Sequence, residues 1–292
     1  MYSRAVSTWV GQQGIAHAGD KPVNTEHQEL RRFLHENSGI CLGPEKNYLI
    51  DSRLPSLLRH NGLENTQQLL ERLQGEPKGP LASAFISALA THETYWFRDQ
   101  RVFDAFRHHL MPAWRARDSR HLNLWSAACS SGQEIYSIAM MLAQEGWFES
   151  EWHITLLASD ICEASLQQAR EGCYSSMEIE RGLPPPLQQR WFERASDHWQ
   201  IDAHLRQRVQ FEQINLLQLP VTLERFDAIF CRNVLIYFDQ TTQAQVLRAL
   251  HSRLATGGWL FLGPVESPLS LCSALFAPGP VSGIYQRIGS AT

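Results

Sequence analysis

The chain has 292 residues, of which 43% are hydrophobic and 19% charged, and it is long enough for one large or two ordinary globular domains. A net charge of −4 argues against a protein that binds nucleic acid over its whole surface, and no apolar run approaches the ~20 residues of a membrane span. The six cysteines form no CxxC pair, which favours reduced thiols in a cytoplasm and gives no sign of a metal site.

The first part of the chain is predicted to be helical. Apolar residues recur at helical spacing over 25–37, 44–53, 66–73 and 81–89. Pro55 is expected to break or restart the second of these helices, and Asn61-Gly62 to end it. A further, largely helical stretch is expected over 99–117.

The pattern changes after residue 120 to alternating strands and helices. Strands are expected over 122–128, 154–159, 226–231, 259–263 and 283–288, and helices over 133–145, 162–171, 184–192 and from Asp239 or Thr241 to 254. Gly257-Gly258 is expected to end the last helix, and 198–202 with 207–214 to form a small polar hairpin. Alternating units predict a doubly wound, mostly parallel sheet with ligands at the carboxyl ends of its strands.

Three segments are expected from these patterns. Residues 1–24 hold three glycines and no apolar signal core, and are expected to form a flexible tail. Residues 25–115 are expected to form the helical N-terminal domain, and 116–292 the sheet domain.

Residues 122–136 have the shape of a nucleotide-binding strand–turn–helix unit. The strand enters a run of small residues that ends at Gly132, and a helical pattern starts at Gln133. Small side chains let a ligand lie against the backbone, and a helix N-terminus offers free N–H groups. The turn is not GxGxxG, so a tight connection without a ligand is the alternative.

Two further strand ends carry polar residues suited to a nucleoside. Asp160 closes the second strand, where a carboxylate accepts both ribose hydroxyls. Its alternative role is the N-cap of the next helix. Asn215 follows the predicted hairpin and is placed to bond an adenine edge, with an Asx-turn as the alternative.

The stretch 230–238 is the most informative. An apolar strand runs into Arg232-Asn233, and apolar residues then lead to Tyr237. Placing Arg232 and Tyr237 beside a buried strand end is costly without a partner. These residues therefore indicate a ligand, with a structural salt bridge and a core tyrosine as the alternative.

Five motifs resemble, in the same order, those of the CheR-type chemotaxis receptor methyltransferases. They are THETYWFR at 91–98, WSAACSSGQEIYSIAM at 125–140, ASDI at 158–161, INLL at 214–217 and CRNVLIYFDQTTQ at 231–243. The resemblance covers residues 25 to 288. It implies an S-adenosylmethionine-dependent O-methyltransferase that forms glutamate methyl esters on the cytoplasmic signalling helices of chemoreceptors, with S-adenosylhomocysteine as product. It also implies a class I methyltransferase sheet with a small inserted β-hairpin subdomain, in a cytoplasmic protein that uses no metal, binds no nucleic acid and does not insert into the membrane.

The resemblance also assigns roles to single residues. Cofactor contacts are expected from His92, Thr94, Arg98, Ala128, Glu134, Asp160, Asn215, Leu216, Asn233 and Val234. His92 stands where the family usually has Asn, and Gln133 stands where it commonly has an acid. Arg232, Tyr237 and Arg98 are expected at the methyl-transfer site. Near the C-terminus the family often shows Gly-His-Ser-Glu, and only the ends of this motif match residues 263–266.

The expected chemistry needs no general base, because a glutamate with a pKa near ~4.3 is already ionised at neutral pH. Alignment and exclusion of water are then the task of the protein. Two other classes compete with this function. Amino-methylating enzymes often carry Asn-Pro-Pro-Tyr after the fourth strand, where this chain has no proline and an arginine ahead. A binding module without catalysis is the third class.

Receptor contacts are expected from Lys46, Arg53 and Arg59, with an ordinary solvated face as the alternative. Some family members also hold a receptor tail pentapeptide on the inserted subdomain, in a longer loop that contains glycine. The corresponding segment here, 192–211, is short and has no glycine. Recognition independent of this tether is therefore predicted.

Overall fold

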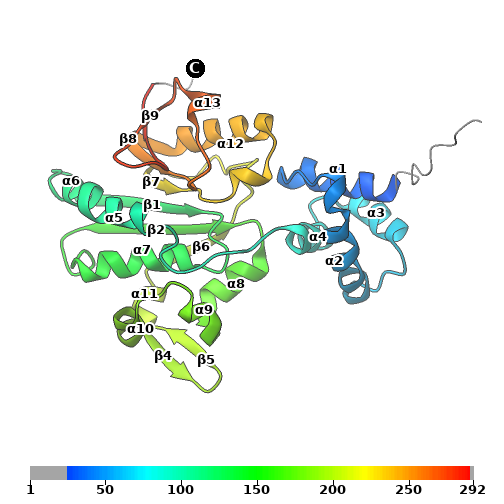
Figure 1. Ribbon diagram of the computed structural model, residues 1–292, viewed down its shortest axis with the longest axis horizontal. Helices are drawn as coiled ribbons and strands as arrows, with labels where there is room; N and C mark the ends of the chain where they lie inside the picture. Colours follow the sequence, from blue (N-terminus) through cyan, green and yellow to red (C-terminus); the bar gives the residue numbers. More distant parts are fainter. Residues whose placement is uncertain (1–24, 290–292) are drawn as a thin grey trace, which may run out of the picture.

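The computed structural model describes residues 25–289, in which a helical domain lies beside a larger sheet domain (Figure 1). The expected tail at 1–24 lies outside the described residues. The helical domain consists of α1 (Thr25–Ser38), the single turn η1 (Pro44–Lys46), α2 (Asn47–His60), α3 (Thr66–Gly75) and α4 (Pro80–Leu89). Leu30, Ile50 and Phe85 lie at the centre of its separate apolar core.

Helix α2 continues through Pro55, where a break or restart was predicted. Proline inside a helix costs about 3 kcal/mol because its ring clashes and a backbone hydrogen bond is lost. Ile50 and Leu57, before and after the proline, are both buried in the domain core. Their packing offsets the local cost and keeps the helix continuous.

The helical stretch after residue 99 packs on the sheet, not on α1–α4. It consists of α5 (Gln100–Ala105), the π-helical turn η2 (Phe106–Leu110) and α6 (Met111–Arg115). Phe106 and Trp114 are buried in the same core as strand residues, and the Phe106 ring meets the ring of Phe230 edge-on at 5.8 Å. These contacts favour a division of the chain near residue 91 instead of the predicted one at 115.

The main sheet has seven strands in the order β6-β2-β1-β7-β8-β10-β9. Their bounds are β1 His121–Ala127, β2 His153–Asp160, β6 Val209–Gln213, β7 Phe226–Phe230, β8 Leu254–Phe261, β9 Phe276–Pro278 and β10 Ile284–Arg287. Neighbours from β6 to β8 pair in parallel, and β10 is antiparallel to β8 and β9. The predicted doubly wound, mostly parallel sheet is confirmed.

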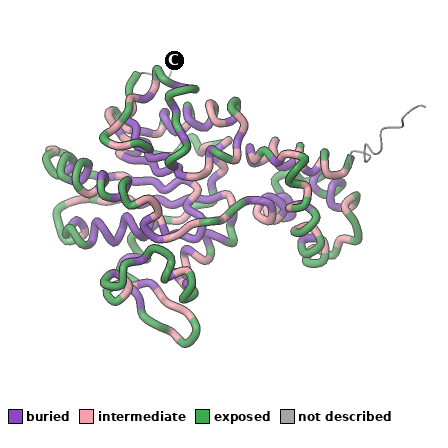
Figure 2. Tube along the Cα trace, in the orientation of Figure 1, coloured by how far each residue is buried: buried purple, intermediate pink, exposed green. Residues whose placement is uncertain are grey.

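Alternate strand residues enter two different cores. Leu124 lies in the core beneath α5, η2, α6 and α7 (Gln133–Gln144), whereas Trp125 lies in the core beneath α12 (Gln240–Arg253) and α13 (Leu269–Cys272). The central strands and α7 are the most continuously buried part of the chain (Figure 2). Among the described residues, no helix is long and apolar enough to cross a membrane.

The predicted small inserted β-hairpin subdomain is confirmed as a second, three-stranded sheet, but the predicted pairing of 198–202 with 207–214 is wrong. Strand β5 (His198–Ile201) pairs with β4 (Phe192–Ala195) and β3 (Cys173–Tyr174), flanked by α9 (Ser176–Glu180), α10 (Pro185–Trp191) and α11 (Ala203–Arg206). The other predicted arm is β6, which pairs in parallel with β2 at the edge of the main sheet. An edge strand with a polar exposed side has the same composition as a hairpin arm. For this reason the sequence pattern assigned 207–214 the wrong pairing partner.

The glycine pair at Gly257-Gly258 does not end a helix. Helix α12 ends at Arg253, and β8 runs through both glycines with a register shift against β7. A Cβ on Gly258 would lie 2.9 Å from the Ala255 carbonyl oxygen, and Gly257 has φ +72°. The glycines therefore permit a bulge inside the strand.

Candidate active site

One pocket lies beyond the carboxyl end of β1, which has β2 on one side in the sheet and β7 on the other. The strand order reverses at this point, and such a reversal commonly forms a ligand crevice. It encloses about 960 Å³ of space, its open mouth included. The helical domain contributes Ser38 and Ile40 to its wall. The pocket brings together all of the predicted cofactor and methyl-transfer residues: His92, Thr94, Arg98, Ala128, Glu134, Asp160, Asn215, Leu216, Arg232, Asn233, Val234 and Tyr237.

The turn after β1 exposes its backbone to the pocket through unusual dihedrals. Ala128 and Ser130 have φ of +63° and +51°, which non-glycine residues rarely adopt. The Cys129 amide donates to the Ser159 carbonyl at 2.8 Å, which ties the turn to β2. A Cβ on Gly132 would lie 2.9 Å from that of Ala169, so only glycine fits without a shift. Strain of this kind is typical of ligand sites.

Asp160 is fixed by two backbone amides. Its Oδ2 accepts from the Ser130 amide at 2.8 Å and its Oδ1 from the Cys162 amide at 2.9 Å. The N-cap residue of α8 (Glu163–Glu171) is Cys162, so Asp160 is not itself the predicted cap. Burial raises the pKa of Asp160 above its ordinary value. The carboxylate therefore links the β1 turn to the start of α8 and lines the pocket from there.

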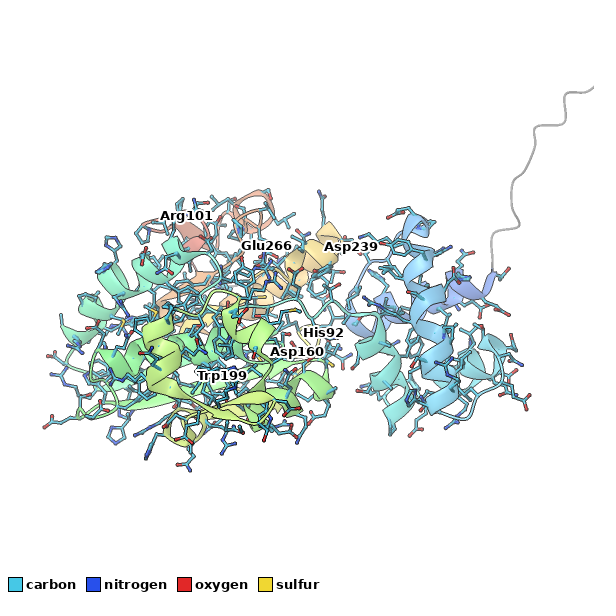
Figure 3. All side chains as sticks on the ribbon, turned by 60° about the horizontal axis from the view of Figure 1, so that its bottom comes forward. His92, Arg101, Asp160, Trp199, Asp239 and Glu266 are labelled. Carbon is cyan, nitrogen blue, oxygen red and sulfur yellow. The ribbon has the colours of Figure 1, made fainter. Side chains whose placement is uncertain are left out.

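His92 lies beside Asp160 between the two domains (Figure 3). Its Nε2 lies 2.9 Å from the Ser87 carbonyl oxygen. A hydrogen bond to Cys162 raises the pKa of His92 to about 9, against the effect of burial. Burial raises the pKa of the Cys162 thiol, but hydrogen bonds from His92, Ser165 and Ser87 together lower it to about 6. The two pKa shifts have opposite directions, and each favours the charged form of its group, with His92 lining the pocket and Cys162 behind it.

Glu134 and Arg232 form a largely buried network in the lining of the pocket. Glu134 Oε1 accepts from the Ser126 hydroxyl at 2.7 Å, and its Oε2 lies 3.1 Å from Arg232 Nη1. Arg232 Nη2 donates to the Arg98 carbonyl at 2.7 Å. The Arg232 side chain is only 1% exposed. The salt bridge raised as the alternative at the sequence level is thus present, and it lies inside the pocket.

Asn215 adopts the Asx-turn that was its alternative role, because its Oδ1 accepts from the Leu217 amide at 3.0 Å. Its Nδ2 donates to the Asn37 carbonyl at 2.7 Å, at the end of α1. The residue therefore joins the two domains at the pocket wall, in addition to facing the pocket.

The sequence interpretation missed Glu266 as a site residue. This buried carboxylate accepts from the backbone amides of Asn233 and Val234, both at 2.8 Å, and of Gly263 at 2.6 Å. Asn233 is held at φ +60°, and its Oδ1 is buried without a hydrogen-bond partner among the described residues. The available signal was that Gly263 and Glu266 match the two ends of the family's Gly-His-Ser-Glu motif, although the middle of that motif differs.

Tyr237 is positioned through its backbone. It ends the short helix η3 (Leu235–Tyr237), and its carbonyl accepts from the Cys41 amide at 2.8 Å. Ile40 and Phe238 form a β-bridge beside it. No described residue hydrogen-bonds the Tyr237 hydroxyl, which leaves it available to a ligand.

The predicted receptor-binding cations lie outside the pocket, on η1 and α2. Lys46 and Arg59 are exposed. Arg53 is half-buried, and its Nη1 donates to the carbonyls of Ala88 and Ala90 at 3.0 and 3.1 Å. Its guanidinium therefore satisfies the carboxyl end of α4 and is less available to a partner than the other two.

Comparison with known families identifies the family to which the chain belongs. The family model described as "CheR methyltransferase, SAM binding domain" matches residues 92–271, and "CheR methyltransferase, all-alpha domain" matches 25–90. The chain belongs to the CheR methyltransferase family. Its cofactor is therefore S-adenosylmethionine, and the mostly parallel sheet is of the class I methyltransferase type.

Relatives of this family resemble the chain over most of its length. Chemotaxis protein methyltransferase Cher2 of Pseudomonas putida is 37% identical over 249 residues, which span 84% of this chain and 90% of the relative. Chemotaxis protein methyltransferase 1 of Pseudomonas aeruginosa is 36% identical, covering 84% and 91%. The chemotaxis protein methyltransferase of Escherichia coli is also 36% identical, covering 82% and 83%. The family models divide near residue 91, as the core packing does.

The pocket fits this cofactor. The carboxylate of Asp160 lies at the end of β2, the backbone after β1 is exposed by small residues, and the buried Asn233 Oδ1 lacks a partner. These groups suit the hydroxyls, amine and ring edges of a nucleoside linked to an amino acid.

Proposed function

We propose that this protein methylates glutamate side chains on the signalling helices of chemoreceptors. The observation that carries the proposal is the Tyr237 hydroxyl, which has no hydrogen-bond partner among the described residues; Tyr237 lines the same pocket as the buried Glu134–Arg232 pair. The names of its relatives, which are chemotaxis protein methyltransferases, support the same substrate class.

S-adenosylmethionine supplies an activated methyl group on a sulfonium centre. The acceptor carboxylate is ionised at neutral pH, so the protein need not remove a proton. Tyr237 is proposed to donate a hydrogen bond to one carboxylate oxygen, which leaves the other oxygen directed at the methyl group. Transfer removes one positive and one negative charge, so exclusion of water by the two domains favours the reaction.

Arg232 is proposed to act as a positioning residue. Its side chain is 1% exposed and engaged by Glu134 and by the Arg98 carbonyl, so it has little freedom to grip an acceptor. Instead it fixes the Glu134 carboxylate and ties the 92–98 segment to the lining of the pocket. This assignment replaces the direct contact with the acceptor that was expected for Arg232.

An amine acceptor is disfavoured by the same loop. Residues 233–237 contain no proline, and Glu266 takes up their backbone amides. A rigid proline-bound carbonyl that would accept an amine hydrogen is therefore missing from this loop.

The decisive experiment is transfer of a labelled methyl group to receptor cytoplasmic fragments, followed by treatment with mild alkali. We expect label that alkali releases as methanol. Label that survives alkali would exclude a glutamyl ester, and an Asp160→Ala protein would control for labelling without bound cofactor.

We also propose that recognition does not depend on a receptor tail peptide. The turn between β4 and β5 has only two residues, Ser196 and Asp197, because Ala195 pairs directly with His198. Ser196 has φ +49°, and the turn holds no glycine. Strand β4 is an edge of the small sheet, but its four residues offer a short ladder to an added strand.

The tether proposal is tested with the free pentapeptide and with a receptor fragment that lacks its tail. We expect no calorimetric binding of the peptide at micromolar concentration and equal methylation of the intact and truncated fragments. Micromolar binding, or loss of methylation on truncation, would overturn it.

A further inference from the structure

Three exposed apolar side chains lie in the two connections that follow β7 and β8: Ile236 in η3, Val265 in the loop after β8, and Leu269 at the first residue of α13. Ile236 is 48% exposed, Val265 79% and Leu269 36%. The other large apolar side chains that are exposed in the described residues, Tyr48, Met177, Val221 and Ile288, lie on separate segments. Single exposed apolar residues need no explanation, but a group on adjoining loops does.

Glu266 joins these two connections. Its Oε1 accepts from the Ile236 amide at 3.3 Å and from the Val234 amide at 2.8 Å, and Val265 is its neighbour in the chain. Because the carboxylate is buried and engaged by amides, it holds the backbone at Ile236 close to the backbone at Val265 without adding an exposed charge. We call Ile236, Val265 and Leu269 the apolar rim.

Ile236 connects the apolar rim to the pocket along the chain. Val234 and Tyr237 line the pocket, and Ile236 lies between them on η3 but is turned to solvent. Leu235, by contrast, is buried in the core. A side chain that reaches the Tyr237 hydroxyl therefore brings its neighbours close to Ile236.

We propose that the apolar rim binds small or apolar side chains that flank the methyl-accepting glutamate on a helical partner. On a helix, residues three and four positions away lie about 5–6 Å from the glutamate on the same face. A rim beside the catalytic tyrosine is at the right place to cover them. The inference rests on the proposed function and adds a determinant of which glutamates are chosen.

The test compares Ile236→Ser, Val265→Ser and the double variant with the wild-type protein, at saturating S-adenosylmethionine and varied receptor fragment. We expect KM for the fragment to rise about 10-fold per site, as expected when one apolar side chain loses its buried contact. The turnover number and the calorimetric affinity for S-adenosylhomocysteine should stay unchanged.

Val221→Ser and Met177→Ser are matched controls, because these side chains are 89% and 81% exposed and lie away from the pocket. They should leave KM unchanged. Replacing the apolar residues three and four positions from the acceptor glutamate by serine should raise KM for the wild-type protein and have little further effect on the double variant.

Direct binding of the fragment in the presence of S-adenosylhomocysteine separates this inference from the proposed function. A missing alkali-labile product in the wild-type protein would defeat the proposed function, whereas the fragment Kd still tests the rim. Unchanged Kd and KM in the double variant would overturn the inference. An equal loss of fragment affinity in the two control variants would also overturn it. So would a dimeric wild-type protein that becomes monomeric in the double variant with an unchanged KM.

Discussion

At the scale of single residues, the pocket is organised before any ligand binds. Asp160, Glu134 and Glu266 each accept at least two hydrogen bonds from the protein, so their carboxylates have fixed directions. A ligand that meets Asp160 and Glu134, which line the pocket, does not have to bear the cost of ordering them, and this preorganisation favours binding. Tyr237 is the exception, because its hydroxyl has no partner among the described residues.

Asp160→Asn and Asp160→Ala test the proposed ribose contact. Two hydrogen bonds to a charged acceptor contribute roughly 1.5–3 kcal/mol each, so affinity for S-adenosylhomocysteine should fall at least ~10-fold in calorimetry. Glu163→Gln, on the exposed first turn of α8, is the control. Equal affinity in wild-type and Asp160→Asn proteins would assign the carboxylate a structural role alone.

Tyr237→Phe tests the acceptor contact. The change keeps the ring packing and removes the hydroxyl, so we expect turnover to fall about 10-fold or more, by analogy with loss of one oriented hydrogen bond. Affinity for S-adenosylhomocysteine and the melting temperature should not change. If turnover stays equal in the two proteins, Tyr237 serves packing and the proposed alignment is wrong.

The His92–Cys162 pair should have a distinctive pH behaviour. His92 has a raised pKa, so alone its stabilisation is complete below pH 6.5 and is lost as pH rises through about 9. Cys162 has a lowered pKa, so alone its contribution is complete above pH 9 and is lost as pH falls through about 6. The two dependences have opposite slopes over the same range, and the pair should add almost no pH dependence to the free energy of unfolding.

Ultraviolet absorbance of the thiolate checks this pair. The difference between wild-type and Cys162→Ser proteins should rise with a midpoint near pH 6. His92→Asn, which restores the residue usual in the family, should move that midpoint upward, whereas His204→Asn at an exposed site should not. A midpoint near the ordinary thiol value in the wild-type protein would contradict the pair.

At the scale of elements, the loops after β7 and β8 behave as one unit because Glu266 bonds to both. Glu266→Gln keeps one acceptor oxygen and replaces the other by a donor that faces backbone N–H groups. Urea denaturation should show a loss of about 1–3 kcal/mol, and turnover should fall because the Asn233 and Tyr237 positions loosen. Glu180→Gln, at an exposed site, is the control. A variant with normal turnover despite lower stability would show that the loop keeps its geometry without Glu266.

The elements also show what sequence patterns can and cannot determine. The βα alternation predicted the parallel sheet, and the polar residues at strand ends identified Asp160 and Arg232, because parallel strands bring their carboxyl ends to one edge. Pairing partners were not predictable where a strand is short, polar and at an edge, as in β6. Local residue preference predicted a helix break at Pro55 and a helix end at Gly257-Gly258. Packing on both sides of Pro55 keeps α2 continuous, and the two glycines form part of a bulge in β8.

Glu266 shows the same limit at the site. Its partners are backbone amides at 233–236, some thirty residues earlier in the chain, and backbone groups carry no residue-type pattern. Tertiary contacts of that kind are visible only once the loops are placed side by side.

At the scale of the whole molecule, the helical domain is docked on the segment that leads from β7 to α12. His35 Nε2 lies 2.6 Å from Asp239 Oδ2, and the Cys41 amide bonds to the Tyr237 carbonyl. Ser38 and Ile40 of the same segment line the cofactor pocket. Ligand binding should therefore stabilise the contact between the domains.

Hydrogen exchange measures this coupling. With S-adenosylhomocysteine at about 100 times its Kd, the Cys41 amide should exchange at least ~10-fold more slowly than in the free protein, since only the docked state binds fully. Amides near Val221, away from the pocket, should be unaffected. Equal exchange at Cys41 with and without the ligand would mean that the domains respond independently.

The path of the chain around the pocket has a consequence for how the family diversifies. The chain lines the pocket at Ser38 and Ile40, leaves it to build α2, α3 and α4, and returns at Ala90 to line it again. Residues 42–89 thus form an excursion whose two ends are anchored at one wall, and it shares its apolar core with α1. Changes on the exposed faces of α2, α3 and α4 leave both anchors in place. We therefore expect the surface that this excursion offers to partners to vary between relatives without a change in the pocket wall.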